Sequence, residues 1–279
     1  MKPLRFLTCC YGDDFAPYLF VLLNSIDEVY GSDAQPMVYY DNLSLDVTRS
    51  IKRKAPRTKL YYYNLKEHNC YVPEPCGGVK GKQENIALER YFITTGVDDA
   101  LDGPLVILDC DMLVTKRLDE YMPDVSNCDI VFTYKTEDDE QLQWPINAGV
   151  QIVNNSEKVR GFYNLWQRET GWIIKNNGDE FNLWGGIQQA ALGRIFKTRS
   201  QEHYQSGFTR NNCFFRGVPC KYLNETRRTQ EIEDVCVLHY KGKWRYVLPD
   251  KEFTKYVNRD NAGKMYDLWQ GHLERWNAR

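Results

Sequence analysis

Residues 105–114 read Leu-Val-Ile-Leu-Asp-Cys-Asp-Met-Leu-Val, an apolar run interrupted by two aspartates. On an extended backbone, side chains two residues apart point to the same side, so Asp109 and Asp111 are expected to project together. Two adjacent carboxylates repel one another unless a positive charge lies between them. A divalent metal, which prefers oxygen ligands, is the expected compensation. Because a metal at a strand end can bind phosphates, the stretch predicts an enzyme acting on a nucleotide or a phosphate ester.

Strand and helix patterns alternate on both sides of this stretch. Strands are expected at 4–11, 36–40, 59–63, 105–109, 129–134, 148–154 and 235–239, and helices at 15–29, 46–55, 84–95, 158–170 and 186–192. Alternation at this spacing predicts an α/β protein with a parallel sheet and helices on both faces. Ligands of such sheets bind beyond the carboxyl ends of the strands, where Asp109 and Asp111 are placed. Residues 196–234 are polar and are expected to form a long irregular segment over the site.

The end of the chain has the pattern of one amphipathic helix. Apolar residues recur there at spacings of three and four, which places them in one stripe: Met265, Leu268, Trp269, His272, Leu273 and Trp276. Basic and acidic residues are nearly balanced, so packing on the rest of the protein is favoured over membrane attachment. We therefore expect one domain over residues 1–249 and a C-terminal helix within 250–279 that packs on it.

Composition narrows the functional classes. The 279 residues are 42% hydrophobic, enough for a large core, and the formal net charge of −2 gives no bulk attraction to nucleic acid. No apolar run reaches the ~20 residues of a membrane span. The nine cysteines include no CxxC pair, and the first residues do not form a signal-peptide core, so a reducing, cytoplasmic setting is expected. Sequons at Asn42, Asn154 and Asn224 are then chance matches.

Four short motifs follow one another along the chain. They are Asp109-Cys110-Asp111, Ile146-Asn147-Ala148-Gly149-Val150, Gly186-Ile187-Gln188-Gln189-Ala190-Ala191-Leu192 and His239-Tyr240-Lys241-Gly242-Lys243-Trp244-Arg245. This set resembles the GT-A-fold glycosyltransferases, and most closely family 8, which includes the glycogenins and the bacterial lipooligosaccharide galactosyltransferases. The opening at 14–19 is also similar to the start of that family, and the resemblance covers residues 4–247. It implies a Rossmann-like nucleotide-binding fold with a mixed, mostly parallel sheet flanked by helices.

The resemblance also implies roles for individual residues. Asp109, Asp111 and His239 match the ligands of a divalent metal, Mn²⁺ or Mg²⁺. The nucleotide-sugar donor would be bound by these two aspartates and by Thr8, Tyr11, Arg90, Cys110, Asn147, Ala148, Gly242, Lys243 and Arg245. The family carries lysine where this chain has Arg245, and Lys243 is the alternative phosphate-binding cation. Tyr11 or Phe15 would stack on the base.

Three residues are candidates for catalysis by the same resemblance: Asn147, Gln188 and Gln189. Asn147 and Ala148 match residues that cradle the sugar. The family typically shows Asp-Gln where this chain has Gln188-Gln189, so the carboxylate sometimes proposed to contact the sugar is replaced. Family 8 implies retention of configuration. An inverting reaction would need a carboxylate base, for which Asp179 and Glu180 are the candidates.

The expected function is transfer of a hexosyl or pentosyl group from a nucleotide sugar, a UDP-sugar by resemblance, to a hydroxyl of a glycan, lipid-linked or protein-linked acceptor. Two alternatives remain open at this stage. One is a haloacid-dehalogenase-type phosphatase with Asp109 as nucleophile and Asp111 as general acid. The other is a non-catalytic relative that only binds a sugar nucleotide.

Overall fold

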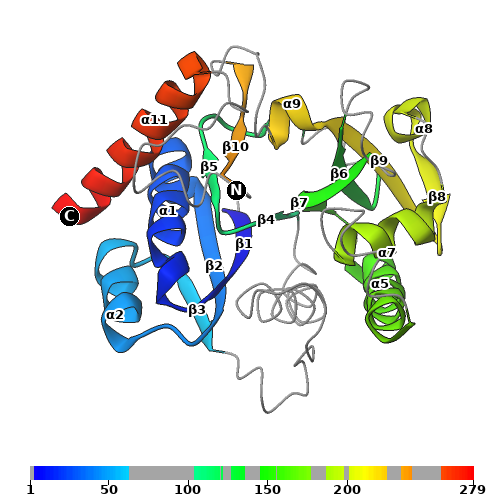
Figure 1. The fold of residues 1–279 in the computed structure, drawn as a ribbon, viewed down its shortest axis with the longest axis horizontal. Coiled ribbons are helices and arrows are strands. Elements are labelled where there is room, and N and C mark those ends of the chain that lie inside the picture. The colour runs from blue at the N-terminus through cyan, green and yellow to red at the C-terminus, as the bar shows by residue number, and fades with distance from the viewer. Residues whose placement is uncertain are drawn as a thin grey trace.

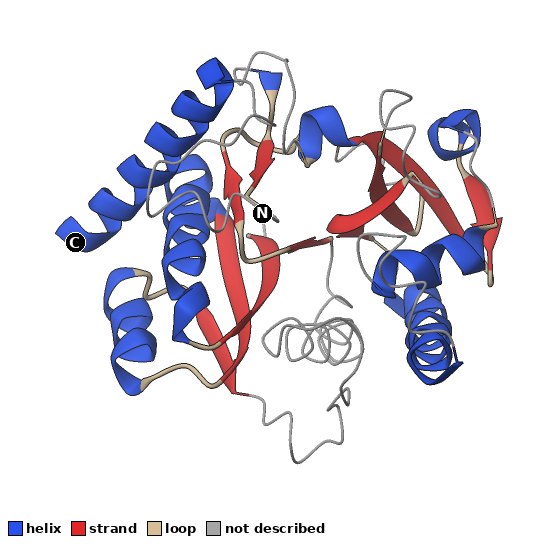
Figure 2. Cartoon of the chain, viewed as in Figure 1, coloured by secondary structure: helices blue, strands red, loops and turns tan. Residues whose placement is uncertain are grey.

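The computed structural model describes residues 3–62, 104–119, 121, 127–135, 145–154, 156–176, 187–197, 201–224, 234–240 and 259–279. Its main feature is an eight-stranded sheet, flanked by helices, in one domain (Figures 1 and 2). The strand order is β3 (Lys59–Tyr62), β2 (Ala34–Asp41), β1 (Leu4–Tyr11), β4 (Leu105–Leu108), β7 (Ile146–Val153), β6 (Ile130–Tyr134), β9 (Cys213–Pro219) and β8 (Phe208–Arg210). The sheet is mixed and mostly parallel, which confirms the expected fold class.

The N-terminal half of the sheet, β1 to β4, is parallel throughout. Two helices, α1 (Ala16–Tyr30) and α2 (Leu45–Lys54), connect its first three strands. β4 is buried at every position, as expected for a parallel strand that is covered on both faces. Here the strands and helices predicted from periodicity agree with the structure to within two residues. The helix expected at 84–95 lies outside the described residues.

The C-terminal half, β6 to β9, mixes parallel and antiparallel pairs. β7 is antiparallel to both β4 and β6, β6 and β9 are parallel, and β8 is antiparallel to β9. Two helices, α5 (Ser156–Asn176) and α7 (Ile187–Phe196), contribute aromatic side chains to the core against β6 and β9. Phe162 of α5 and Phe215 of β9 lie with ring centroids 4.6 Å apart, edge to face. This packing fixes the strands that carry part of the functional site.

The prediction of an irregular segment over 196–234 is wrong. The described part forms α8 (Gln201–Ser206), β8, β9 and α9 (Cys220–Leu223). Strands β8 and β9 form a hairpin whose two-residue loop, Asn211-Asn212, has positive φ at both positions. This is the conformation that a tight hairpin turn requires, and asparagine tolerates it. Strand β8 has only three residues and its neighbourhood is polar, so composition concealed a hairpin whose second strand, β9, is hydrogen-bonded on both edges.

The last helix, α11 (Arg259–Ala278), lies along α1 (Figure 1). The predicted apolar stripe is confirmed, since Met265, Trp269, His272 and Trp276 are buried and Leu268 and Leu273 are partly buried. Trp276 stacks on Phe20 of α1 at a centroid distance of 4.7 Å. The domain boundary expected at residue 249 falls outside the described part of the chain. None of the helices described is long and apolar enough to cross a membrane.

Candidate metal centre

The two aspartates lie in a turn between β4 and β5 (Met112–Val114) rather than on one continuous strand. The sequence argument for their convergence, alternation along an extended backbone, is therefore wrong in its mechanism. The turn brings both carboxylates to the same place because β5 leaves the main sheet and pairs with β10 (Val237–His239). In that antiparallel pair, His239 lies opposite Met112, next to Asp111. The backbone N–H of Tyr240 donates to the carbonyl of Asp111 at 2.8 Å and fixes this register.

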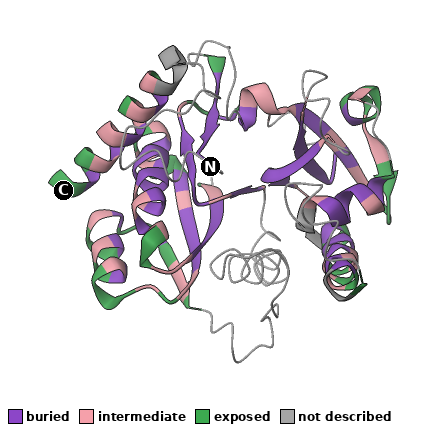
Figure 3. Cartoon of the chain, in the orientation of Figure 1, coloured by how far each residue is buried: buried purple, intermediate pink, exposed green. Residues whose placement is uncertain are grey.

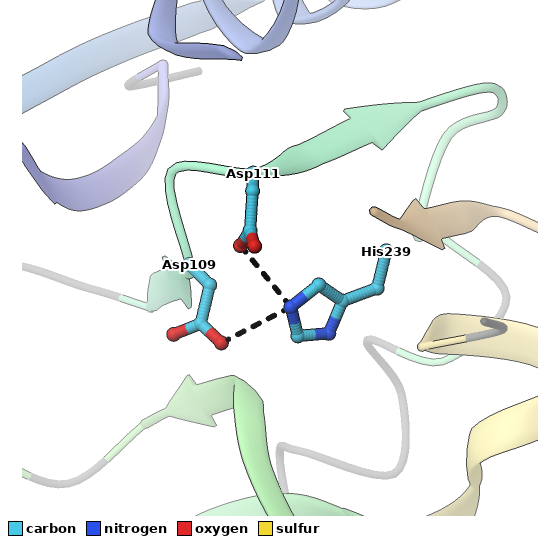
Figure 4. A group of neighbouring side chains, drawn as sticks. All are labelled: Asp109, Asp111 and His239. Carbon is cyan, nitrogen blue, oxygen red and sulfur yellow. Dashed lines mark hydrogen bonds and ion pairs between the residues drawn. The ribbon is translucent and has the colours of Figure 1, made fainter. Parts of the chain in front are cut away.

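Asp109, Asp111 and His239 thus form one cluster (Figure 4). Their potential ligand atoms all lie within 4.8 Å of one another. Nε2 of His239 is 3.1 Å from Oδ1 of Asp111 and 3.4 Å from Oδ2 of Asp109. Asp111 and His239 are buried, whereas the side chain of Asp109 is 30% exposed. The cluster is therefore enclosed by protein on one side and reaches solvent at Asp109.

Strand β7 approaches the cluster through an irregularity in its pairing with β6. Phe132 pairs with Gln151, but the next residue, Thr133, pairs with Asn147. Three residues of β7 therefore have no partner on β6 at this point, which is the arrangement of a β-bulge near a functional site. Gln151 holds the bulge by donating from Nε2 to the carbonyl of Ala148 at 3.0 Å.

Gly149, inside this bulge, leaves the space that the cluster needs. Its carbonyl accepts from the N–H of Asp109 at 3.1 Å. A Cβ at this position would lie 3.0 Å from Oδ2 of Asp109 and 3.0 Å from Cε1 of His239. Only glycine therefore allows β7 this close to the two ligands without displacing them. The requirement is invisible in the sequence, where Gly149 appears only as a member of the second motif.

Asn147 and Thr8 each carry a buried polar atom that lacks a hydrogen-bond partner within the described part of the protein. Oδ1 of Asn147 accepts from the N–H of Gly149 at 3.0 Å, but its Nδ2 has no acceptor. Oγ1 of Thr8, on β1, is likewise buried and unpaired. A buried polar group left unpaired costs about 1–3 kcal/mol. Such atoms are candidates for contact with a bound ligand.

The structure describes some of the remaining predicted site residues and not others. Tyr11 is half-buried at the end of β1, Ala148 is buried in β7, and Gln189 is half-buried in α7. The pKa of the Cys110 thiol is raised well above its ordinary value, mainly by a hydrogen bond with Cys10 of β1 and also by burial. This thiol is therefore neutral and lies against β1. Arg90, Gly242, Lys243, Arg245, Asp179 and Glu180 lie outside the described residues, as does the side chain of Gln188.

Sequence reasoning missed two residues that support the cluster. Nδ1 of His239 lies 2.7 Å from Oδ1 of Asn224, and Nδ2 of Asn224 donates to Oγ1 of Thr133 at 2.9 Å. In the sequence, Asn224 stands only at the start of a chance sequon within an expected irregular segment. A side chain that acts from outside the four motifs carries no local signal, because its role depends on a contact between residues far apart in the chain.

The donor set fits a divalent cation. Two carboxylates and one imidazole are ligands suited to Mn²⁺ or Mg²⁺, and the open side at Asp109 leaves room for ligands from a substrate. The absence of a side chain at Gly149 also fits this role, because a Cβ there would crowd the side chains of Asp109 and His239. In the part of the chain that the structure describes, this is the only group of three or more such side chains within ligand distance.

Comparison with known proteins supports the fold. No family model and no curated protein matches the sequence. Among solved structures, the glycosyltransferase GlyE of Streptococcus pneumoniae TIGR4 matches over 100% of this chain and 64% of its own, with a TM-score of 0.59 and 14% identity. The galactosyltransferase LgtC, in complex with donor and acceptor sugar analogues, matches over 96% of both chains with a TM-score of 0.58 and 12% identity. Mouse xyloside xylosyltransferase 1 matches over 85% of this chain and 97% of its own, with a TM-score of 0.50 and 11% identity.

These likenesses define the class of fold. The mixed sheet with its flanking helices is the GT-A fold, and the three matching structures named above are glycosyltransferases. The chain spans about two thirds of the length of GlyE and nearly the whole length of LgtC.

Proposed function

We propose that this protein is a metal-dependent glycosyltransferase of the family 8 type that uses a nucleotide sugar, a UDP-sugar, as donor. The observation that carries the proposal is the cluster of Asp109, Asp111 and His239 at the carboxyl end of β4, in a fold shared with glycosyltransferases. Ligands of open α/β sheets bind at this edge. The acceptor is proposed to be a hydroxyl of a glycan, lipid-linked or protein-linked glycoconjugate in the cytoplasm.

The chain's own residues would bind and orient the donor. Asp109, Asp111 and His239 would hold the cation between them, and when bound it would supply Lewis-acid stabilisation of the leaving diphosphate. The unpaired Nδ2 of Asn147 and Oγ1 of Thr8 offer hydrogen bonds to the donor's polar groups. Tyr11, Arg90, Cys110, Ala148, Gly242, Lys243 and Arg245 are proposed as the other donor-binding residues.

The catalytic roles of Asn147, Gln188 and Gln189 remain part of this proposal. One of the matching structures is of an LgtC variant in which an active-site glutamine is replaced by glutamate. That replacement supports keeping glutamines as candidates for contact with the reacting sugar. Retention of configuration follows the family 8 resemblance, and Asp179 or Glu180 would be the base if the reaction inverted instead.

The test is donor hydrolysis. Wild-type protein is incubated with a panel of UDP- and GDP-sugars and Mn²⁺, with and without EDTA, and release of nucleoside diphosphate is measured. We expect release from one UDP-sugar, abolished by EDTA and lowered about 10²–10³-fold in Asp111→Ala, because the leaving group loses its stabilisation. Asp119→Ala is the matched control, since Asp119 is exposed and forms an ion pair with Arg117 at the surface.

Two results would contradict the proposal. Absence of hydrolysis together with absence of metal-dependent nucleotide binding would leave only the shared fold. Covalent phosphorylation of Asp109 during turnover of a phosphate ester would instead establish the phosphatase alternative.

A further inference from the structure

A chain of buried hydrogen bonds leads from β7 to the imidazole of the metal cluster. Thr133 Oγ1 donates to the carbonyl of Asn147 at 3.0 Å, and Asn224 Nδ2 donates to Thr133 Oγ1 at 2.9 Å. Oδ1 of Asn224 lies 2.7 Å from Nδ1 of His239. All four residues are buried, so water does not compete for these bonds. These hydrogen bonds therefore form one connected network.

Which group donates and which accepts in each hydrogen bond of this network follows from the backbone carbonyl at one end. The carbonyl of Asn147 can only accept, so the single hydroxyl proton of Thr133 is donated there. Thr133 must then accept from Asn224, which places the NH₂ group of Asn224 toward Thr133 and its oxygen toward His239. Because that oxygen cannot donate, Nδ1 of His239 carries a proton.

The opposite nitrogen of the ring is thereby left for the cluster. Nε2 faces the carboxylates of Asp109 and Asp111, at 3.4 and 3.1 Å. If the Asn224 amide were reversed, its oxygen would face a hydroxyl whose only proton is already donated, and a buried acceptor would be left unpaired. The network thus selects one orientation of the amide and one protonated nitrogen on the ring.

We propose that Asn224 and Thr133 are positioning residues that keep the proton on Nδ1 of His239 and so reserve Nε2 as a ligand for a divalent cation. The proposal rests on the metal site of the proposed function and goes beyond the residues that touch the metal. Ligating histidines commonly donate their second N–H to such a partner, and loss of that partner typically lowers metal affinity about 10–100-fold.

The fold explains why these two residues can do this. Asn224 directly follows α9, and its backbone N–H bonds to the carbonyl of Cys220 at 2.7 Å, which fixes where its side chain begins. Thr133 is the residue of β6 at which the pairing with β7 shifts. The same burial keeps the Asn224 amide from serving as a glycan acceptor in the folded protein, although it begins an Asn-Glu-Thr sequence.

The test compares variants of similar shape by their affinity for Mn²⁺ alone, measured by titration calorimetry without nucleotide. Asn224→Leu removes the acceptor and should weaken binding about 10–100-fold. Asn224→Asp keeps an oxygen for Nδ1–H and should bind nearly as well as wild type. Thr133→Val frees the Asn224 amide to reverse and should weaken binding, whereas Thr133→Ser keeps the hydroxyl and should restore it.

A second measurement does not depend on the metal. Long-range ¹H–¹⁵N spectra of protein labelled at its four histidines report whether each ring nitrogen carries a proton, with His239 assigned by its absence in His239→Gln. Wild type, Thr133→Ser and Asn224→Asp should show protonated Nδ1. In Thr133→Val and Asn224→Leu, a population with unprotonated Nδ1 should appear.

Three results would overturn the proposal: unprotonated Nδ1 in wild type, undiminished Mn²⁺ affinity in Asn224→Leu, or equal losses in Asn224→Asp and Asn224→Leu, which would indicate a packing role. If Nδ1 responds as expected but wild type binds no Mn²⁺, the positioning network stands and the proposed metal-dependent function fails.

Discussion

The two halves of the sheet differ in the regularity of their strand pairing and in the side chains that they bury. β1 to β4 pair in parallel with unbroken register, whereas the pairing of β6 with β7 shifts at Thr133 and buries Asn147 and Gln151. Both halves are largely buried along these strands, so burial alone does not distinguish them (Figure 3). The difference lies in what is buried. The strands of the N-terminal half bury mainly apolar side chains, with Thr8 as an exception. Those of the C-terminal half bury Thr133, Asn147 and Gln151, and Thr133 and Asn147 belong to one hydrogen-bonded network.

This contrast indicates how stability and chemistry are divided. The N-terminal half, covered by α1, α2 and α11, gains its stability mainly from burial of apolar surface. The C-terminal half positions Gly149 and the Asn147–Thr133–Asn224 network against His239. The metal cluster lies where the halves meet, at the end of β4.

The largest expected effect is a loss of stability when apolar packing on the N-terminal half is removed. Trp276→Ala removes a fully buried side chain between α11 and α1 and should lower the free energy of unfolding by about 3–5 kcal/mol. Mn²⁺ affinity of the folded protein should be unchanged. Urea denaturation checks the first expectation and calorimetry the second. Trp172→Ala is the control, because Trp172 is 44% exposed and its ring lies under the guanidinium of Arg194; it should cost about 0.5–1 kcal/mol. Loss of Mn²⁺ binding in folded Trp276→Ala would show that the halves are not separable.

An intermediate effect tests the other half. Gly149→Ala places a Cβ 3.0 Å from the carboxylate of Asp109 and from the ring of His239, so the ligands must move. We expect Mn²⁺ affinity to fall by at least about tenfold, since small displacements of such groups are costly. Overpacking should lower stability by about 1–3 kcal/mol. Gly263→Ala in α11 meets nothing within 4 Å and should stabilise the helix by up to about 1 kcal/mol. Unchanged affinity in Gly149→Ala would refute the claim that glycine reserves space for the site.

The smallest effect concerns the polar contacts where α11 meets α1. Burial lowers the pKa of His272, and nearby Glu28 only partly offsets this. Burial alone would raise the pKa of Glu28, but the hydrogen bond from Arg275 and the charge of His272 outweigh it and lower that pKa. Nδ1 of His272 lies 2.9 Å from Nδ2 of Asn24, which also donates to Oε1 of Glu28 at 2.7 Å. Because an amide nitrogen can only donate, this contact favours the neutral imidazole with Nδ1 unprotonated.

The sign of the pH dependence follows from these directions. Because the folded pKa of His272 is below the unfolded value, the unfolded state takes up more protons as pH falls below about 6.5. Stability is therefore greatest above that pH and is lost as pH decreases; Glu28 adds a further loss below about 4.5. We therefore expect the melting temperature to fall between pH 7.5 and 5.5. His272→Gln should flatten this change, whereas His203→Gln, at an exposed position, should leave it intact. An equal slope in His272→Gln would exclude His272 as its source.

The sequence by itself determined the elements that repeat with a period. Apolar runs located β1 to β4, and the 3–4 spacing located α1 and the buried stripe of α11, because periodicity records which face is buried. The GT-A fold and the membership of Asp109, Asp111 and His239 in one cluster followed from four motifs in order, and the structure brings these three side chains together.

Only the tertiary structure decided how that cluster is built. The turn after β4, the bulge beside Gly149 and the bonds from Thr133 and Asn224 depend on contacts between residues far apart in the chain; Asn224 and Thr133 are separated by 91 positions. No local pattern encodes such contacts, because a buried hydrogen bond is specified by where two side chains meet and not by what surrounds either one in sequence.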